Sequence, residues 1–350
     1  MKSTKEQVLQ ILTDAAGSYI SGQEIAKQLY VTRASVWKAI RALRLDGHRI
    51  EAVTNKGYRL HADPDSLTRE RIAIFLDRYV DNKEPAPEEL HVLIQDPERL
   101  QVFETVASTN TIAAGISGLS MEDTNENRLC AVVIADRQTA GRGRRGRDFY
   151  SPKGSGIYMS LLVHPKENAQ LSTGFTCMMA VAASRAIAKI LDLQIGIKWV
   201  NDLFCQGKKV AGILTEGSVS VEDNSVSGVI IGIGINVYAP EDGFPKDIET
   251  VAGSLLPAGM AETDLRNRLC AAVITEFLRI FHADDPSAFL EEYRSRSFLT
   301  GQYVRINDFS GRAYKYALVE GIDDAFHLCV RYDNGEKEAL SSGEVSVVRY

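Results

Sequence analysis

The residues with the strongest chemical character form one stretch, Gly141-Arg142-Gly143-Arg144-Arg145-Gly146-Arg147, in which arginine and glycine alone occupy seven positions. A guanidinium stays charged at any relevant pH and presents a planar fork of donors, and glycine lets backbone amides approach a ligand closely. We therefore expect a loop that binds a phosphate or a carboxylate; the alternative is a solvated basic loop on the surface. The letters also spell Gly-x-Gly-x-x-Gly, but Pro152 and two glycines follow where a dinucleotide-binding helix would have to begin, so a Rossmann fold is rejected.

A second set of chemical groups lies at the end of an apolar stretch, Ile195 to Asp202. Lys198 is a lone cation in that stretch, so it is either an outward-facing lysine on a surface strand or a functional amine. Asn201 and Asp202 bring oxygen atoms close to this amine. Asp202 suits either a Mg²⁺ ligand or the start of a turn.

Two further stretches place polar or small residues beside predicted strands. Ser108-Thr109-Asn110 follows a strand predicted for Leu100–Val106, and Thr109 or Asn110 is expected to cap a helix over Thr111–Ile116. The free amides of that helix suit an anion or a polar ligand, and plain capping is the alternative interpretation. Gly232-Ile233-Gly234-Ile235-Asn236 puts its glycines on one face of a strand, where another backbone or a flat ligand can approach.

The elements that position these groups belong to a chain of 350 residues, long enough for roughly two to three domains. A composition of 45 % apolar and 25 % charged residues is typical of a soluble globular protein, and no apolar run reaches the roughly 18 residues of a membrane helix. The first residues carry no signal-peptide pattern. Five isolated cysteines indicate neither a disulfide framework nor a zinc site, so we expect a cytoplasmic protein with no membrane partner.

Charge divides the chain unevenly. Residues 1–62 contain ten Lys or Arg against five Asp or Glu, a net charge of +5, whereas the whole chain carries −6 and the remainder therefore −11. A basic head on an acidic body indicates a separate nucleic-acid-binding module. Apolar spacing predicts helices over 3–16, 23–30 and after Thr32, and a hairpin of Arg49–Val53 with Gly57–Leu60, which together are typical of a winged helix-turn-helix.

The third predicted helix carries several cations of this head. Arg33, Trp37, Arg41 and Arg44 share one of its faces, and Lys56 lies at the tip of the hairpin. The residues expected to contact DNA are Arg33, Ser35, Trp37, Lys38, Arg41 and Lys56. Trp37 packs either on DNA or on the rest of the protein, and a small basic bundle that binds another protein is the alternative for the whole head.

After a predicted linker at 63–67, the pattern alternates helices with strands. Long helices are predicted for Leu171–Leu193 and Thr263–His282, and a loop for Asn82–Glu89. From Thr300 onwards, short strands joined by turns predict a small β-barrel. We therefore predict an α+β protein with domains at 1–62, 63–299 and 300–350.

Taken in order, the motifs resemble those of biotin–protein ligases. The matching residues are Ser108-Thr109-Asn110, Gln138, Gly141–Arg147, Lys198–Asp202, Lys209–Leu214 and Gly232–Asn236. The arginine-rich loop and the Lys-Trp-x-Asn-Asp strand are specific in combination. With the basic head in front, essentially the whole chain resembles the bifunctional class, in which a biotin ligase is also the biotin operon repressor.

The resemblance implies a fold and a reaction. The fold would be a winged helix-turn-helix, a central domain similar to class II aminoacyl-tRNA synthetases with a mixed sheet and helices, and a C-terminal SH3-like barrel. ATP and Mg²⁺ would activate biotin as biotinyl-5′-AMP, which would be both the intermediate passed to a lysine of a biotin carboxyl carrier domain and the corepressor. Operator DNA and a homodimer formed in the liganded state are the other implied partners.

The resemblance also implies roles for individual residues. Lys198, Arg142 and Arg144 would be catalytic. Biotin would be held by Ser108, Thr109, Asn110, Gln138, Arg142, Gly143, Arg144 and Lys198, ATP or the adenylate by Arg144, Arg147, Phe149, Asn201, Asp202 and Asn236, and Mg²⁺ by Asp202.

Three positions depart from the family pattern: Val200 where Pro is often found, Ala211 where Gly is common, and Phe149 where Trp is frequent. Val200 and Ala211 keep the packing small and apolar, whereas Phe149 keeps an aromatic face and loses the indole donor. Two alternative functions remain. A regulator that senses biotin without ligating it is disfavoured by the retained Lys198 and loop arginines, and a lipoate-type ligase is disfavoured by the arginine-rich loop.

Overall fold

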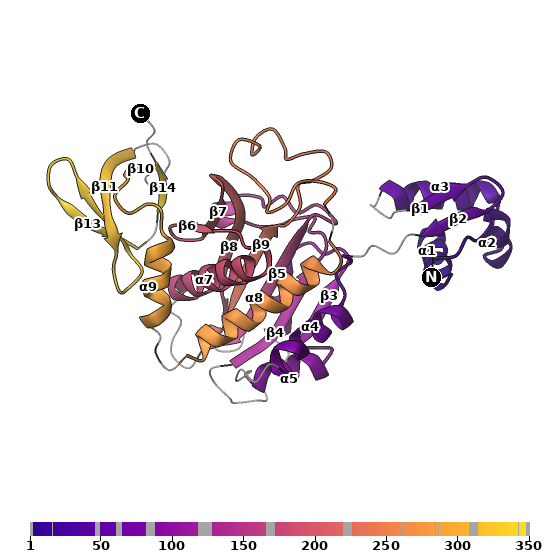
Figure 1. Ribbon diagram of the computed structural model, residues 1–350, viewed down its shortest axis with the longest axis horizontal. Helices are drawn as coiled ribbons and strands as arrows, with labels where there is room; N and C mark the ends of the chain where they lie inside the picture. Colours follow the sequence, from indigo (N-terminus) through magenta and orange to yellow (C-terminus); the bar gives the residue numbers. More distant parts are fainter. Residues whose placement is uncertain are drawn as a thin grey trace. The chain divides into compact units, whose positions relative to one another are not determined.

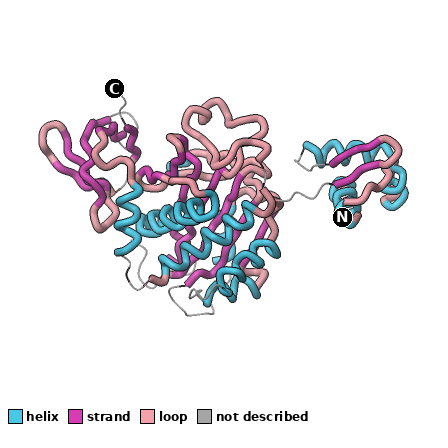
Figure 2. The backbone as a smooth tube through the Cα atoms, in the orientation of Figure 1, coloured by secondary structure: helices cyan, strands magenta, loops and turns pink. Residues whose placement is uncertain are grey.

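The computed structural model of the protein describes residues 3–15, 17–45, 50–60, 65–81, 88–117, 128–165, 172–219, 226–260, 262–283, 285, 287–307, 314–341 and 343–347. The expected strand start at Arg49 and linker residues 63 and 64 lie outside these ranges. Two compact units make up the chain, Met1–Ser66 and Leu67–Tyr350 (Figure 1). Helices dominate the first unit, and the second combines helices with two separate sheets (Figure 2).

Three helices and one strand pair form the first unit: α1 (Thr4–Asp14), α2 (Gly22–Gln28), α3 (Arg33–Leu45), β1 (Ile50–Val53) and β2 (Gly57–Leu60). Hydroxyl side chains cap the helices, as at Thr32, whose Oγ1 accepts from the amide of Ser35 at 3.1 Å. Leu12, Ile25 and Ile40, one from each helix, are buried in a small common core. The three predicted helices and the antiparallel pairing of the two strands are confirmed.

The central sheet of the second unit has seven strands in the order β3-β4-β5-β9-β8-β7-β6. Their bounds are β3 (Leu100–Phe103), β4 (Arg128–Ala135), β5 (Gly156–His164), β6 (Gly196–Lys198), β7 (Asp202–Cys205), β8 (Lys208–Val219) and β9 (Val226–Asn236). β3 runs parallel to β4, and the other neighbouring strands pair antiparallel. The sheet is therefore mixed and largely antiparallel, as expected.

Side-chain alternation along the strands separates the two faces of this sheet. On β4, Val132 and Ile134 belong to the large core under α7 (Ser172–Leu191) and α8 (Leu265–Phe281), which lie side by side across the sheet (Figure 1). Ala131 and Val133 point the other way, into a smaller core under α6 (Thr109–Ser117). The α7–α8 pair covers one face of the sheet, and α6 packs on the opposite face.

The helix α7 is unusually apolar. By length and composition, its segment Thr173–Leu191 is the one helix among the described residues that could cross a membrane, but most of that segment is buried inside the protein. Its position between the sheet and α8 accounts for the composition, because a helix that is buried all round is apolar all round.

Further helices and a second sheet complete this unit. α4 (Arg69–Asp81) packs on α5 (Glu88–Gln95) and α8, and α9 (Ser287–Arg296) packs on α7. The second sheet is antiparallel, in the order β13-β12-β11-β10-β14, and contains β10 (Tyr303–Asn307), β11 (Tyr314–Ile322), β12 (Leu328–Tyr332), β13 (Lys337–Leu340) and β14 (Glu344–Val347). Its inward residues, such as Val304, Val319 and Val330, join the large core.

Two sequence-based predictions about loops and strands are wrong in their bounds. The loop predicted for Asn82–Glu89 gives way to α5 at Glu88, because Leu90 and Leu93 bury their side chains in the large core; residues 82–87 lie outside the described part of the chain. The strand predicted for Leu100–Val106 ends at Phe103, and Val106 instead makes an isolated bridge with Gln138.

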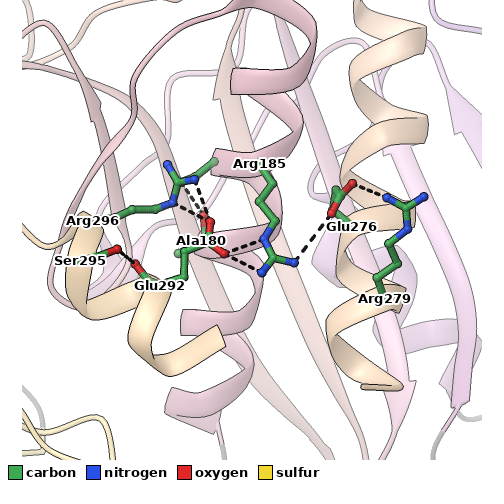
Figure 3. Close-up of polar contacts among 8 residues, drawn as sticks. Ala180, Arg185, Glu276, Arg279, Glu292, Ser295 and Arg296 are labelled. Atoms are coloured by element: carbon green, nitrogen blue, oxygen red, sulfur yellow. Dashed lines mark hydrogen bonds and ion pairs between the residues drawn. The ribbon is translucent and has the colours of Figure 1, made fainter. Parts of the chain in front are cut away.

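Charged side chains tie α7, α8 and α9 together (Figure 3). Arg185 on α7 lies 2.6 Å from Glu292 on α9 and 3.9 Å from Glu276 on α8. Arg296 donates to Glu292 at 2.8 Å, and Arg279 pairs with Glu276 at 2.6 Å. The arginines stay charged at any relevant pH, so this network links the three helices wherever the two glutamates are ionised.

Candidate functional site

Strand register aligns four residues into one row across the central sheet. Lys198 on β6 pairs with Asp202 on β7, Asp202 with Gly212 on β8, and Gly212 with Gly234 on β9. Directly paired residues of antiparallel strands project from the same face. Ile230, four residues before Gly234 on β9, belongs to the core under α6, so the row lies on the α6 face.

The glycines of β9 are required because two side chains rest directly on them. A Cβ atom at Gly234 would lie 2.3 Å from the ring of Phe149, and one at Gly232 would lie 2.2 Å from Oδ1 of Asn110. The predicted close approach to these glycines is therefore made by two side chains, and both glycines also line the cavity described below, so the approach of a flat ligand stays a prediction. In this structure the aromatic ring of Phe149 and the amide of Asn110 occupy the space.

A chain of hydrogen bonds begins at the polar triplet before α6. The backbone amide of Thr109 donates to Gln138 Oε1 at 2.9 Å, and Gln138 Nε2 donates to Ser151 Oγ at 3.1 Å. Ser160 Oγ lies 2.7 Å from Thr109 Oγ1 and 2.6 Å from Asn110 Oδ1. Ser108, Thr109 and Asn110 are all buried, so these polar groups form a preorganised wall.

The start of α6 differs from its prediction. The carbonyl of Ser108 accepts from the amide of Ile112 at 3.2 Å, so the helix begins at Thr109 and not at Thr111. Ser108 therefore takes the position before the helix that was predicted for Thr109 or Asn110. The earlier start of the helix depends on a tertiary contact. The side chain of Gln138 accepts from the Thr109 amide and so pairs one of the free backbone donors of the first turn.

The arginine-rich loop closes on itself as a short hairpin. The amide of Gly143 donates to the carbonyl of Arg147 at 2.7 Å, and that of Phe149 donates to the carbonyl of Gly141 at 2.9 Å. At the tip, Arg145 and Gly146 have φ values of 59° and 69°, the left-handed region that glycine tolerates best. In this hairpin Arg142, Arg145 and Arg147 are exposed, whereas Arg144 is partly buried.

Arg142 and Arg144 each have a partner on a different strand or turn. Arg142 Nη2 lies 3.0 Å from Glu216 Oε2 on β8. Arg144 Nη1 donates to Asn201 Oδ1 at 3.1 Å, and Asn201 Nδ2 in turn donates to the carbonyl of Ile213 at 3.0 Å. The two guanidinium groups are thus held over the α6 face of the sheet.

The residues predicted to bind the ligand line one cavity of about 380 Å³. Every residue predicted to hold biotin, ATP or Mg²⁺ lines it: Ser108, Thr109, Asn110, Gln138, Arg142, Gly143, Arg144, Arg147, Phe149, Lys198, Asn201, Asp202 and Asn236. Its volume falls in the range typical of small-molecule sites. Arginine and lysine side chains from separate segments give the cavity a positive charge suited to an anionic ligand.

Several residues that line the cavity were not predicted from the sequence. Lys209, noted only as part of a motif, lies 2.7 Å from Asp202 Oδ1 and adds a cation to the cavity. The segment 244–252 contributes Phe244, Ile248 and Val251, and Gly343 and Val345 come from the C-terminal sheet region. The segment 244–252 has no helical or strand periodicity, so no local sequence pattern could have identified it. Asn236 Nδ2 donates to the carbonyl of Gly253 at 2.9 Å and so helps to hold this side of the cavity.

The strand that carries Lys198 is anchored from the other side of the sheet. Trp199 Nε1 donates to the carbonyl of Phe326 at 2.9 Å, and Tyr293 Oη donates to the carbonyl of Val200 at 3.0 Å. Burial raises the pKa of the Tyr293 phenol well above its usual value, so the hydroxyl keeps its proton and remains a donor. The C-terminal sheet and α9 therefore contribute to the position of Lys198.

Asp202 is the residue predicted to hold Mg²⁺. Within the described residues, no group of three or more His, Cys, Asp or Glu side chains is arranged for a metal ion. Mg²⁺ usually keeps several waters and takes one or two carboxylates together with substrate phosphates. Asp202 offers the cavity one carboxylate, whose Oδ1 is paired with Lys209 at 2.7 Å, so an ion held here would share this carboxylate with the lysine amine.

The residues predicted to contact DNA belong to the first unit. Arg33, Trp37, Lys38 and Arg41 are exposed on α3, with the Arg41 guanidinium 5.8 Å from the Trp37 ring. Trp37 is 54 % exposed and available to a ligand, whereas Ser35 is half-buried and hydrogen-bonds Thr32 at the helix start. Lys56 is exposed between the strands, 5.6 Å from the Tyr19 ring.

Arg44 is exposed on α3 like Arg33, Trp37 and Arg41, but it also has a partner within the unit. Its guanidinium donates to the carbonyl of Ile50 at 2.7 and 2.9 Å. These hydrogen bonds give the carbonyl of Ile50, the first residue of β1, its donors and link α3 to the strand pair.

Family models match three parts of the chain. An HTH domain matches residues 4–59, the biotin/lipoate A/B protein ligase family matches 102–236, and the biotin protein ligase C-terminal domain matches 300–348. The class of protein is thus a protein ligase with a helix-turn-helix domain in front.

Relatives that match almost the whole chain define the family more closely than the separate domain models do. The bifunctional ligase/repressor BirA of Bacillus spizizenii is 35 % identical, and that of Bacillus subtilis 34 %, over 98 % of this chain and 98 % of each relative. The solved biotin protein ligase from Aquifex aeolicus in complex with biotin and ATP has a TM-score of 0.56 at 25 % identity, covering 72 % of this chain and 100 % of that one. The chain belongs to the family of BirA bifunctional ligase/repressors.

Proposed function

We propose that this protein is a biotin–protein ligase and a repressor of biotin genes. It would form biotinyl-5′-AMP from biotin and ATP and transfer biotin to a lysine of a biotin carboxyl carrier domain. One observation carries the proposal: buried hydrogen-bonding groups and several cations, from segments far apart in sequence, line the same cavity. Such a cavity suits a neutral polar head at one end and anionic groups at the other.

The polar wall at the start of α6 would hold the ureido ring of biotin. Ser108, Thr109 and Asn110 are each no more than 5 % exposed, and Gln138 is hydrogen-bonded to Thr109. Buried groups of this kind recognise a ligand that replaces their hydrogen bonds, because unpaired polar atoms are costly in a dry site. Gly143 and the arginines of the loop would meet the carboxylate end.

Activation would bring two anions together, since the biotin carboxylate attacks the α-phosphorus of ATP and pyrophosphate leaves. Arg142, Arg144 and Lys198 would neutralise this repulsion and the charge that grows on the leaving group. Asn201 would keep Arg144 in place through its Oδ1 atom. Arg147, Phe149 and Asn236 would contact the nucleotide side of the adenylate.

Mg²⁺ would be held by Asp202 together with ATP phosphates, and it would supply charge neutralisation. Asp202 would have to share its carboxylate with Lys209, which lies 2.7 Å away. In the second reaction, the carrier lysine amine attacks the carbonyl of the mixed anhydride and AMP leaves. The arginine-rich loop would exclude water from the anhydride, and the reaction needs no serine or cysteine nucleophile of the enzyme.

The first unit would act as a winged helix-turn-helix that binds operator DNA. Arg33, Trp37, Lys38 and Arg41 would face the DNA from α3, Ser35 would contact it near the helix start, and Lys56 would reach a phosphate from the strand pair. Biotinyl-5′-AMP would be the corepressor, and a homodimer formed in the liganded state would place two such units on one operator.

The remaining assignments follow from the same proposal. The central domain would be similar to class II aminoacyl-tRNA synthetases, and the five-stranded C-terminal sheet would be an SH3-like barrel. The domains would span 1–62, 63–299 and 300–350; the division found between Ser66 and Leu67 lies close to the first of these boundaries. The protein would act in the cytoplasm.

The test is direct biotinylation. Full-length protein is incubated with ATP, Mg²⁺, labelled biotin and a biotin carboxyl carrier domain, and label is measured on the carrier. A carrier whose target lysine is replaced by arginine is the control. Biotin binding with no label on the carrier would favour a non-catalytic regulator, and preferential transfer of lipoate to a lipoyl domain would favour a lipoate-type ligase.

A further inference from the structure

Glu216 on β8 contacts two parts of the proposed ligand site through a single oxygen atom. Its Oε2 accepts from Asn110 Nδ2 at 2.7 Å and lies 3.0 Å from Arg142 Nη2. Asn110 belongs to the first turn of α6, and Arg142 belongs to the arginine-rich loop. A carboxylate that accepts two such bonds links the polar wall of the cavity to its cations.

The two partners of Glu216 differ in how tightly the protein packs around them. Asn110 is 5 % exposed, its Oδ1 lies 2.6 Å from Ser160 Oγ, and it rests directly on Gly232. The Arg142 side chain is 48 % exposed and sits on a loop. Glu216 is therefore fixed by a buried amide and reaches out to an exposed guanidinium.

We propose that Glu216 is a positioning residue that tethers Arg142 at the mouth of the cavity before biotin arrives. The inference rests on the proposed function, because it takes Arg142 as a partner of the biotin carboxylate. The loop places four arginines in seven positions, and their mutual repulsion favours side chains that turn towards solvent. The Glu216 carboxylate offsets this repulsion at one of them, so less freedom is lost when the ligand binds.

The tether should affect biotin more than ATP. A guanidinium has several donors, so Arg142 can keep its contact with Glu216 while it binds a second carboxylate. Arg144 has a different holder, Asn201, and Lys198 is fixed by its strand. Loss of the Glu216 charge therefore leaves the other cations of the cavity in place.

The test variant is Glu216→Gln, which keeps the size of the side chain and an oxygen for Asn110 but removes the charge that holds Arg142. In biotin-dependent pyrophosphate exchange, we expect the KM for biotin to rise about tenfold, the scale of one lost charge-assisted hydrogen bond. The KM for ATP and the Tm should stay close to those of the wild type. Trypsin should cut the arginine-rich loop faster in the ligand-free variant than in the ligand-free wild type.

Two controls separate the tether from a general effect of removing a carboxylate. Glu320→Gln, which removes a carboxylate 2.9 Å from both Arg331 and Lys337 on the C-terminal sheet, should leave both KM values unchanged. In an Arg142→Ala background, Glu216→Gln should have no further effect on the KM for biotin, because the tethered group is already gone.

The outcomes distinguish this inference from the function on which it rests. An unchanged or lowered KM for biotin in Glu216→Gln would overturn the tether, and so would a further increase in the Arg142→Ala background. A wild-type protein without biotin-dependent pyrophosphate exchange would instead contradict the proposed function itself.

Discussion

Lys198 differs from the arginines of the cavity because a strand, and not a loop, holds it. The residues that follow it are anchored by hydrogen bonds from Trp199 to the carbonyl of Phe326 and from Tyr293 to the carbonyl of Val200. A cation whose position is already fixed stabilises a growing negative charge without reorganisation. Lys198 is therefore the cation on which we expect the transition state to depend most.

Replacing Lys198 tests this view at the level of the single residue. Lys198→Ala should keep a cooperative melt and lower biotin-dependent pyrophosphate exchange by roughly a hundredfold or more, the scale for removing one electrostatic stabiliser. The control is Lys189→Ala, because Lys189 is a half-exposed lysine on α7 that lies 4.0 Å from Glu276 and outside the cavity. If Lys198→Ala turns over at close to the wild-type rate, Lys198 is not a catalytic residue.

The two glycines of β9 make a second residue-level prediction, because each lies under a different side chain. Gly232→Ala should displace Asn110 and raise the KM for biotin, whereas Gly234→Ala should displace Phe149 and raise the KM for ATP. We expect each effect to be roughly tenfold to a hundredfold, since a misplacement of about 1 Å acts on that scale. Steady-state kinetics with each substrate varied in turn would measure the split.

Gly115→Ala is the matched control for these variants, because a Cβ atom at Gly115 would meet nothing within 4 Å apart from its chain neighbours and the backbone of α6. Equal effects of Gly232→Ala and Gly234→Ala on both substrates would show that the glycines do not separate the biotin side of the cavity from the nucleotide side.

Among the secondary-structure elements, α9 joins the network of charged helices to the site. Glu292 on α9 accepts from Arg185 and Arg296 (Figure 3). The next residue, Tyr293, donates to the carbonyl of Val200. Burial by itself raises the pKa of Glu292, but the hydrogen bonds from Arg185 and Arg296 outweigh it and leave the pKa below its usual 4.5. The ionised carboxylate is therefore the form that stabilises this part of the fold.

This shift predicts how the stability of α9 depends on pH. A carboxyl group whose pKa is lower in the folded state contributes stability above its unfolded pKa and loses it as the pH falls through the folded value. The wild type should therefore exceed Glu292→Gln in free energy of unfolding at neutral pH, and the difference should shrink once the pH falls below 4.5. Denaturant unfolding of both proteins over this range measures the difference.

Glu291→Gln is the control for the pH experiment. Glu291 pairs with Arg294, but its side chain is 74 % exposed, so this ion pair should contribute little. A wild-type advantage over Glu292→Gln that persists unchanged on acidification would contradict the assignment of the stability to the ionised form.

On the scale of the whole molecule, the ligand cavity and the DNA-binding candidates belong to different compact units. All residues that line the cavity follow Leu67, whereas the exposed cations of α3 precede Ser66. A protein that starts at Leu67 should therefore melt cooperatively and still biotinylate the carrier domain at a rate within about tenfold of the full chain. Transfer of label by the two proteins, compared at equal concentration, measures this. Complete loss of ligation in a folded truncation would show that the first unit takes part in the reaction.

Regulation is the second prediction for the whole molecule. A single helix-turn-helix unit with a net charge of +5 makes few phosphate contacts, so a monomer should bind DNA weakly and lose affinity with salt. If the adenylate orders the arginine-rich loop, it lowers the entropy cost of a dimer that uses this loop, a coupling of typically about 1–3 kcal/mol. Sedimentation and operator binding at constant salt should show dimers and paired half-site protection most strongly with biotin plus ATP.

Two comparison conditions complete that experiment, one without ligand and one with biotin alone. Equal operator affinity in all three conditions would mean that DNA binding by this protein is not switched by its ligand.

Local patterns in the amino-acid sequence were enough to predict the types of residue that do the chemistry and most of the elements that carry them. Glycine and arginine spacing predicted the loop at 141–147, and helical periodicity predicted α1, α3 and α7. These signals are local because capping, turn formation and amphipathic spacing act over a few neighbouring residues. The resemblance of ordered motifs then supplied biotin, which no single motif specifies.

Contacts between distant segments settled the rest. The row from Lys198 to Gly234 depends on the register of four strands, and nothing in any one strand specifies how it pairs with the next. The roles of Glu216 and Lys209 depend on partners far away in the chain or on a neighbouring strand, so their residue types alone could not distinguish them from surface charges. Strand pairing and packing bring such groups together, because a buried polar group is stable only where most of its atoms find hydrogen-bond or ionic partners.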